Sequence, residues 1–186
     1  MDALDLLLTR ESALKLDSPG PSQADLDAMF QSAVRAPDHG RLRPWQFVVI
    51  DTNRRERFGE LMAQSMRRRD PEASEEMLRR EHAKALRAPV IVVVAAKVQK
   101  GHRIAEFEQV TSAAAATQNI MLAANARGFG AMWKTGDAAY DPEVKVALGL
   151  KPEDEIMGFI YIGTSTGGSS PAPRPEADKF VTVWQG

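Results

Sequence analysis

The spacing of apolar side chains predicts an alternation of helices and strands along the 186 residues. Two helices are expected near the start, because Asp2 and Ser22 can each cap a helix and apolar residues then recur every three or four positions. Pro37 ends the second of these helices. Four more helices are expected over residues 54–69, 72–87, 111–127 and 142–148.

Short runs of β-branched and aromatic residues predict four strands, at 45–50, 88–96, 131–135 and 155–163. The second run (APVIVVVAA) is almost entirely apolar, which is typical of a central strand covered on both faces. Long helices separate these strands at irregular intervals. We therefore expect a single α+β domain over residues 1–186, with a central mixed β-sheet flanked by helices.

The segment 164–186 differs from the rest of the chain in composition. It contains three glycines and three prolines, and it carries the apolar residues Phe180, Val181, Val183 and Trp184 close to its end. An extended arm with an apolar tip must bury that tip. We expect the arm to lie along a partner subunit, with a strap on its own core as the alternative.

The charge of the chain is nearly balanced, since 24 Lys and Arg accompany 25 Asp and Glu and the formal net charge is −1. This balance disfavours a nucleic-acid-binding field over the whole molecule. A local basic run, Arg67–Arg69, is followed at once by acidic residues from Asp70 to Glu76. We expect a solvated helix face there, with nucleic-acid binding as the alternative.

Cysteine is absent, which excludes disulfides, thiolate nucleophiles, iron–sulfur clusters and Cys-ligated zinc. No metal is expected, because His102 and Glu106 stand four residues apart without a second pair of ligands. The longest apolar stretch, 89–96, is far shorter than the ~18 residues of a membrane span. The first residues lack the basic segment of a signal peptide, so we expect a cytoplasmic protein.

Three segments place polar side chains where a ligand could bind. Arg10-Glu-Ser12 could hold one phosphate through a guanidinium and a hydroxyl. The segment 35–43 carries three arginines and a histidine directly before a strand, where pockets form. The segment 128–136 could present backbone N–H groups and the Trp133 ring to a flat ligand. Each also has a structural interpretation: a helix-end arginine with a turn serine, a surface loop anchored by Trp45, and an ordinary helix–turn–strand.

Together these segments resemble the nitroreductase family of flavoproteins. Arg10-x-Ser12 is similar to the family's opening Arg-x-Ser signature, and Ala36-Pro37 followed by Arg43-Pro-Trp-Gln-Phe47 is similar to its loop and strand. The alanine-rich segment before Gly128-x-Gly130 resembles its long helix and turn. Two further pieces look like the short bacterial NAD(P)H nitroreductases in particular: Arg35-Ala-Pro-Asp-His39 and Trp133-Lys-Thr-Gly136.

The resemblance covers the whole chain. It implies a nitroreductase-like fold, an intertwined homodimer with the arm 164–186, and FMN bound at the subunit interface. It also implies a ping-pong reaction in which hydride passes from NADH or NADPH to FMN and then to an oxidised acceptor such as a nitroaromatic or a quinone. Because FMN carries this chemistry, no catalytic side chain is expected. The alternative is a flavin-binding protein without turnover, such as a redox sensor.

Residue by residue, the resemblance implies one set of cofactor-binding positions. Arg10 and Ser12 would hold the FMN phosphate, with Glu11 contributing through its backbone. The remaining members would contact the cofactor from the loop before the strand or line the flavin ring: Arg35, His39, Trp133, Lys134 and Thr135.

Other basic residues enter as secondary candidates. Arg174 is placed like a second phosphate-binding arginine of larger family members. Lys15 and Arg35 are candidates for the positive charge that stabilises N1 and O2 of reduced flavin. Two positions depart from the family pattern, Glu11 where relatives are often basic and Arg43 where Gln or Asn is common, and both bear on FMN affinity and substrate range.

Overall fold

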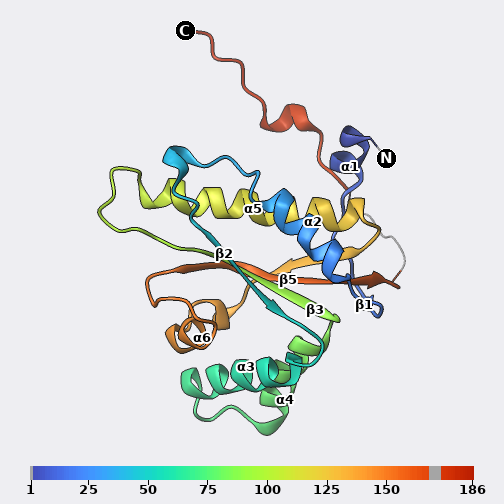
Figure 1. Ribbon diagram of the computed structural model, residues 1–186, viewed down its shortest axis with the longest axis vertical. Coiled ribbons are helices and arrows are strands. Elements are labelled where there is room, and N and C mark those ends of the chain that lie inside the picture. The colour runs from blue at the N-terminus through green and yellow to red at the C-terminus, as the bar shows by residue number, and fades with distance from the viewer. Residues whose placement is uncertain (1, 168–172) are drawn as a thin grey trace.

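A computed structural model describes residues 2–167 and 173–186 of the protein (Figure 1). The described residues form one helix for each that the sequence predicts: α1 (Ala3–Thr9), α2 (Gln23–Ala33), α3 (Arg55–Arg69), α4 (Glu75–Ala83), α5 (Glu106–Ala126) and α6 (Pro142–Ala147). The strands are β1 (Leu16–Asp17), β2 (Trp45–Ile50), β3 (Val90–Ala96), β4 (Gly130–Lys134) and β5 (Glu155–Ser165). The last four correspond to the predicted strands, and β1 is a short addition.

Side-chain caps fix where the first two helices begin. The Asp2 carboxylate accepts hydrogen bonds from two backbone N–H groups in the first turn of α1. Ser22 and Asp25 form a reciprocal capping box at the start of α2. The long helix α5 starts at Glu106, earlier than predicted, because its first turn is polar and lacks the apolar pattern on which the prediction rested.

The sheet is built around β5, which pairs with β3 on one side and with β4 on the other. Strand β2 lies beside β3, and β1 pairs with the end of β5. Every one of these pairings is antiparallel, so the expectation of a mixed sheet is wrong for the described chain. The reason lies in the connections: two helices, α3 and α4, follow β2, and the chain therefore enters β3 in the opposite direction. Strands β3 and β4 run the same way, but β5 separates them.

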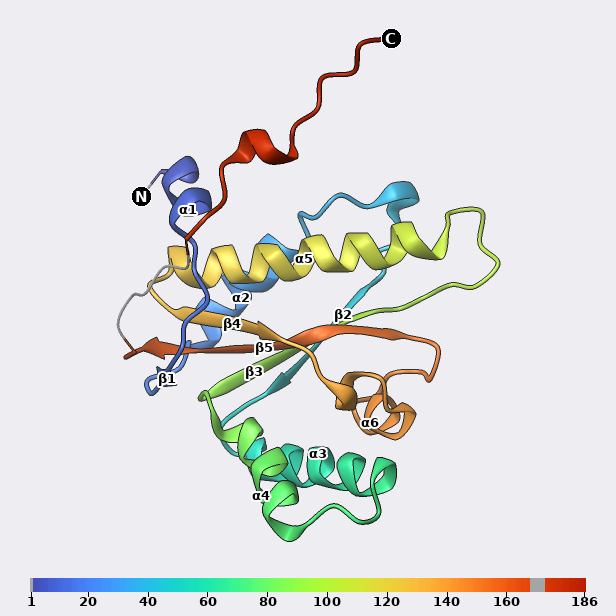
Figure 2. The same ribbon diagram turned by 180° about the vertical axis from the view of Figure 1, so that it is seen from behind.

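Helices cover both faces of the sheet (Figure 2). Helices α2 and α5 pack on one face, where Val92 and Val94 of β3 point. Helices α3 and α6 cover the other face, where Ile91 and Val93 point. All residues of β3 are buried, which confirms it as a central strand and agrees with the α+β class.

The described part of the tail, 173–186, leaves the body of the molecule near α1 and extends away from it (Figure 1). The apolar residues at its tip are exposed, among them Phe180 at 75% and Trp184 at 88%. A strap on the core of its own chain is therefore wrong for these residues. Burial against a partner subunit stays a prediction.

The basic run at the end of α3 is neutralised within the chain. Arg67 pairs with Glu75, Arg68 with Asp141, and Arg69 with Asp137, as the ion pairs at these positions show. Three of the arginines on which the nucleic-acid alternative depended are thus paired within the chain. That alternative also rested on Arg79 and Arg80, of which Arg80 pairs with Glu76. Separately, no helix among the described residues combines the length and apolar character needed to cross a membrane.

Candidate functional site

The segment Arg10–Ser12 connects α1 to β1 and lies beside β4. The N–H of the next residue, Ala13, donates a hydrogen bond to the carbonyl oxygen of Ala131 in β4 over 3.0 Å. Ala13 is buried and fixes the segment, whereas the Ser12 side chain is exposed. The segment is therefore held by the sheet while its hydroxyl stays accessible to a ligand.

The tail brings a second arginine to this segment. The Nη2 atom of Arg174 donates a hydrogen bond to the carbonyl oxygen of Arg10 over 3.1 Å. Two arginines and one serine thus meet at one end of the molecule. Guanidinium and hydroxyl groups are the donors that bind a phosphate well.

Two adjoining cavities lie next to this segment, and we call them together the β4 groove. Their volumes are about 180 Å³ and about 200 Å³. Both are lined by Arg87, Lys134 and Tyr161. The second cavity is also lined by Ala13, which follows Arg10 by three residues. Because three residues span at most about 10 Å, the backbone of Arg10 lies no further than that from Ala13. The groove therefore begins within reach of the candidate phosphate site.

The floor of the β4 groove is apolar and its rim is basic. Phe159 and Tyr161 of β5 are buried in the floor. Burial raises the pKa of Tyr161 to about 12, although the nearby Arg87 guanidinium acts in the opposite direction. The Tyr161 hydroxyl thus stays neutral over the physiological range and remains a hydrogen-bond donor.

The predicted ring-lining residues divide between the two faces of β4. Thr135 and Lys134 line the β4 groove. Trp133 points to the other face, where its ring packs beside the core under α2 and α5. Its indole N–H donates to the carbonyl oxygen of Met157 over 2.9 Å. That hydrogen bond gives Trp133 a structural role, and its contact with the flavin stays a prediction.

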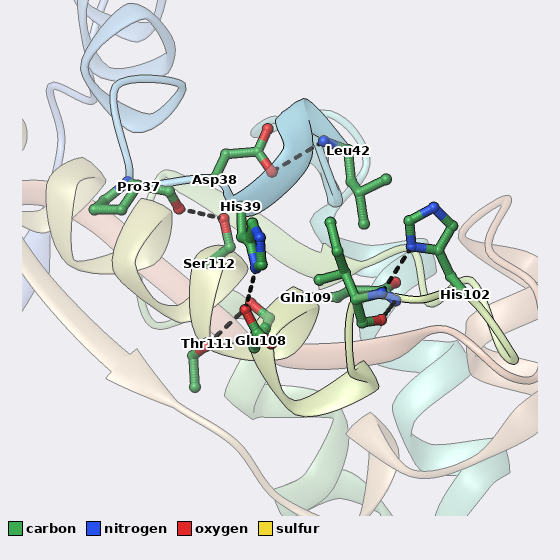
Figure 3. Close-up of polar contacts among 10 residues, drawn as sticks. Pro37, Asp38, His39, Leu42, His102, Glu108, Gln109, Thr111 and Ser112 are labelled. Atoms are coloured by element: carbon green, nitrogen blue, oxygen red, sulfur yellow. Dashed lines mark hydrogen bonds and ion pairs between the residues drawn. The ribbon is translucent and has the colours of Figure 1, made fainter.

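The loop that carries His39 is clamped onto the first turns of α5 (Figure 3). The Nδ1 atom of His39 lies 2.5 Å from a carboxylate oxygen of Glu108, and the Ser112 hydroxyl donates to the carbonyl oxygen of Pro37 over 2.6 Å. The Asp38 carboxylate accepts hydrogen bonds from two backbone N–H groups further along the loop. These contacts give the loop a fixed shape.

The same loop contains strained backbone. Arg41 and Arg43 adopt positive φ values of 56° and 50°, a conformation that costs non-glycine residues energy. Both side chains are exposed. The departure at position 43 from the family pattern therefore affects the loop surface and not the core.

A buried glutamine supports the neighbouring segment. The side chain of Gln109, only 1% exposed, bonds to both backbone groups of Gln99 and to the carbonyl oxygen of Ile104. His102 is used locally, since its Nδ1 accepts from the N–H of Ile104 (Figure 3). Among the described residues, no group of three His, Asp or Glu side chains is placed to hold a metal ion.

The predicted site residues are spread along α5 (Figure 2). Arg35 lies beside the interior of this helix, because the carbonyl oxygen of Ser32 accepts hydrogen bonds from the Arg35 N–H and from the Asn119 side chain. The segment Arg10–Ser12 lies near the end of this helix, and His39 is bound to its first turn. The helix has 21 residues, which corresponds to about 30 Å. The described chain therefore holds His39 about one helix length from Arg10 and does not bring these two residues together in one site.

Sequence reasoning missed Arg87 and Tyr161. The available signal was a pair of basic residues, Lys84 and Arg87, directly before the apolar run that forms β3. Lys15, which the sequence analysis named as a secondary candidate, does not line the β4 groove. Its side chain is 66% exposed, and its ammonium lies 3.3 Å from the Asp17 carboxylate.

Solved structures with this fold include nitroreductases. The nitroreductase-like family protein from Bacillus cereus superposes with a TM-score of 0.85 at 21% identity, covering 100% of this chain and 97% of that one. The nitroreductase with bound FMN from Bacteroides fragilis gives 0.75 at 21% identity, with full coverage of both chains. These likenesses confirm the nitroreductase-like fold.

Sequence comparisons lead to the same group. The protein named "Putative NAD(P)H nitroreductase YdjA" from Escherichia coli K12 is 36% identical over 189 residues, covering 99% of this chain and 100% of the relative. A "Putative NAD(P)H nitroreductase" from Haemophilus influenzae is 35% identical over 165 residues, covering 88% and 89%. The model of the nitroreductase family matches residues 7–164. The chain therefore belongs to the nitroreductase family.

Proposed function

We propose that the protein is an FMN-dependent oxidoreductase that accepts hydride from NADH or NADPH and passes it to an oxidised acceptor such as a nitroaromatic or a quinone. Family membership supports the class of reaction. The observation that most directly supports FMN as the cofactor is the position of the Arg10–Ser12 segment at the end of the β4 groove, where Arg174 is hydrogen-bonded to it.

The residues of the β4 groove fit the two parts of FMN. The phosphate requires cationic and hydroxyl donors, and Arg10, Arg174 and Ser12 supply them. The isoalloxazine requires an apolar surface with polar groups at its edges, and the groove offers Phe159 below a basic rim. When bound, FMN supplies the site that accepts and donates hydride.

The chain's own residues would then bind and orient the cofactor. Arg10 and Ser12 hold the phosphate, with Glu11 contributing its backbone. Lys134 and Thr135 lie along the ring. No side chain has to act as nucleophile or general base, because hydride transfer between two cofactors needs alignment and exclusion of water.

A homodimer completes this site. Because His39 lies about one α5 length from Arg10, it would reach the FMN that a second chain binds, and Arg35 at the start of the same loop would approach that FMN with it. Exposed apolar side chains at both ends of the chain support such pairing, since a leucine face on α1 and the tip of the tail are exposed: Leu4, Leu7, Leu8, Phe180 and Trp184. We also propose a cytoplasmic location, where NADH and NADPH are available.

The test is an anaerobic reductive titration of the purified protein. A yellow protein whose flavin absorbance is bleached by NADH or NADPH, and which then reduces a panel of quinones and nitroaromatics, is the expected result. Bleaching without turnover of any acceptor would instead indicate a flavin-binding redox sensor. A protein that takes up no FMN would refute the proposal.

A further inference from the structure

Two loops beside the start of α5 carry five exposed basic side chains, and we call this surface the basic patch. The first loop, 38–44, precedes β2, and the second, 97–105, connects β3 to α5. The N–H of Lys97 donates to the carbonyl oxygen of Pro44 over 2.7 Å, and a Cβ atom at Gly40 would collide with the Ile104 side chain. The two loops are therefore packed together (Figure 3). The members of the basic patch are Arg41, Arg43, Lys97, Lys100 and Arg103.

The five cations have no counter-ion among the described residues, since none of their side chains forms an ion pair or a hydrogen bond there. The second loop contains no acidic residue. In the first loop, the Asp38 carboxylate accepts hydrogen bonds from two backbone N–H groups of its own loop, over 3.1 and 2.8 Å. On α5, Glu108 is bonded to His39, and Glu106 is exposed at the border of the patch. The patch thus keeps an excess of positive charge, which favours an anionic ligand.

The first loop holds its two arginines in a fixed conformation. Arg41 and Arg43 have φ values of 56° and 50°. Such values cost non-glycine residues energy and persist only where the surroundings impose them. Here the Asp38 carboxylate and the Ser112 hydroxyl hold the backbone of the loop. A ligand that binds both guanidinium groups therefore does not have to order the loop first, which favours binding.

We propose that the basic patch binds the 2′-phosphate of NADPH and so gives the protein a preference for NADPH over NADH. This inference rests on the proposed function, which leaves the donor open between the two. A phosphate monoester carries a charge of about −1.5 to −2 at pH 7. Arginine accommodates this group, whereas the free 2′-hydroxyl of NADH is recognised by a carboxylate. The patch offers three arginines, and the Asp38 carboxylate of its first loop is already bonded to backbone.

The position of the patch agrees with this role. Arg41 follows His39 by two residues, and two residues span at most about 7 Å. In the proposed dimer His39 lies at the site that two chains share, so the patch lies beside that site. A long polyanion such as nucleic acid fits the surface less well, because Glu106 borders it and the chain as a whole carries a formal net charge of −1.

The test measures the binding of NADP⁺, NAD⁺, adenosine 2′,5′-bisphosphate and 5′-AMP to the FMN-loaded protein by isothermal titration calorimetry. All four ligands carry no hydride to donate, so the heat reports binding alone. We expect each ligand with a 2′-phosphate to bind at least about tenfold more tightly than its counterpart without one, and this preference should shrink as the salt concentration rises.

Two double variants, one in each loop, identify the residues responsible. Arg41→Gln with Arg43→Gln, and Lys100→Gln with Arg103→Gln, should each lower the preference about threefold to fivefold and leave the affinity for NAD⁺ unchanged. Arg41→Lys with Arg43→Lys keeps the charge and should retain most of the preference. Arg79→Gln, an exposed arginine on α4, is the matched control and should behave as the wild type.

The outcomes separate this inference from the proposed function. If the flavin is bleached by both reduced nucleotides but NADP⁺ and NAD⁺ bind equally, the inference is wrong and the proposed function stands. A protein that takes up neither FMN nor nucleotide would overturn both. Variants that lose affinity for NAD⁺ as much as for NADP⁺, or a loss of preference in Arg79→Gln, would also refute the inference. A short DNA duplex that displaces NADP⁺ with a steep salt dependence would assign the patch to nucleic acid instead. If one double variant does not fold, the variant in the other loop decides.

Discussion

The guanidinium of Arg174 donates a hydrogen bond to the main-chain oxygen of Arg10 although the two residues are 164 positions apart. The contact uses one of several donors on the Arg174 fork and leaves the others available. It brings the Arg174 side chain to the backbone of the Arg10–Ser12 segment. The tail therefore belongs to the candidate phosphate site of its own chain.

This relationship predicts the effect of removing either arginine. Arg10→Ala and Arg174→Ala should each weaken FMN binding by about 1.5–3 kcal/mol, the contribution of a hydrogen bond to a charged group. Riboflavin, which lacks the phosphate, should bind both variants and the wild type equally. Fluorescence titration with the two flavins measures the difference. Equal losses for riboflavin and FMN would place the arginines away from the phosphate.

The exposed tip of the tail predicts a dimer that depends on it. Phe180→Ser and Trp184→Ser keep Arg174 in place and remove only apolar surface. Because large aromatic anchors dominate the energy of interfaces, the double variant should shift the equilibrium toward monomer. Sedimentation equilibrium over a range of concentrations measures this. An unchanged dimer would show that the tip docks elsewhere, and a monomeric wild type would refute the shared site.

Much of the fold could be predicted because most of its helices and strands follow from the pattern of apolar and polar residues within short stretches of the sequence. The strand Trp45–Ile50 has the predicted bounds, and the buried Val90–Ala96 follows from its apolar run. Strand direction could not be predicted, because it depends on how α3 and α4 return the chain to the sheet. Strand β1 has only two residues, too few for any periodic signal.

The candidate site likewise combines residues that a local motif predicts with residues that only the pairing of strands brings together. Arg10 and Ser12 sit in a compact motif, and Arg174 follows from the family pattern in the tail. Arg87 was missed because nothing local distinguishes it from other arginines at helix ends. Its place beside Tyr161 and Lys134 arises only when β3, β4 and β5 pair.

The close packing of Trp133 against Gly158 leaves no room for a side chain at position 158. A Cβ atom at this position would lie 2.3 Å from the Trp133 Nε1 atom and 2.8 Å from the carbonyl oxygen of Lys134. Gly158→Ala must therefore push β4 away from β5. We expect a loss of about 1–3 kcal/mol in the free energy of unfolding. Chemical denaturation measures this loss, and a variant as stable as the wild type would contradict the packing described here.

The environment of Asp25, at the contact between α2 and the end of α5, should make the free energy of unfolding depend on pH. Its carboxylate accepts a hydrogen bond from the Ser22 hydroxyl over 2.7 Å and from the Nε of Arg127 over 2.8 Å. These partners, Ser22 first and then Arg127, lower the pKa of Asp25 from its ordinary value of 3.8 to about 2.

The sign of the effect follows from proton binding. Between pH 4 and pH 2 the unfolded chain binds a proton at Asp25 that the folded chain resists, so the stabilisation is complete above about pH 4 and is lost as the pH falls to about 2. Asp25→Asn should therefore flatten the fall in the free energy of unfolding over this range, and Ser22→Ala should flatten it in part. Urea denaturation at a series of pH values measures these slopes. If Asp25→Asn retains the wild-type slope, the acid sensitivity arises from other carboxylates, and the capping box with Arg127 contributes nothing to it.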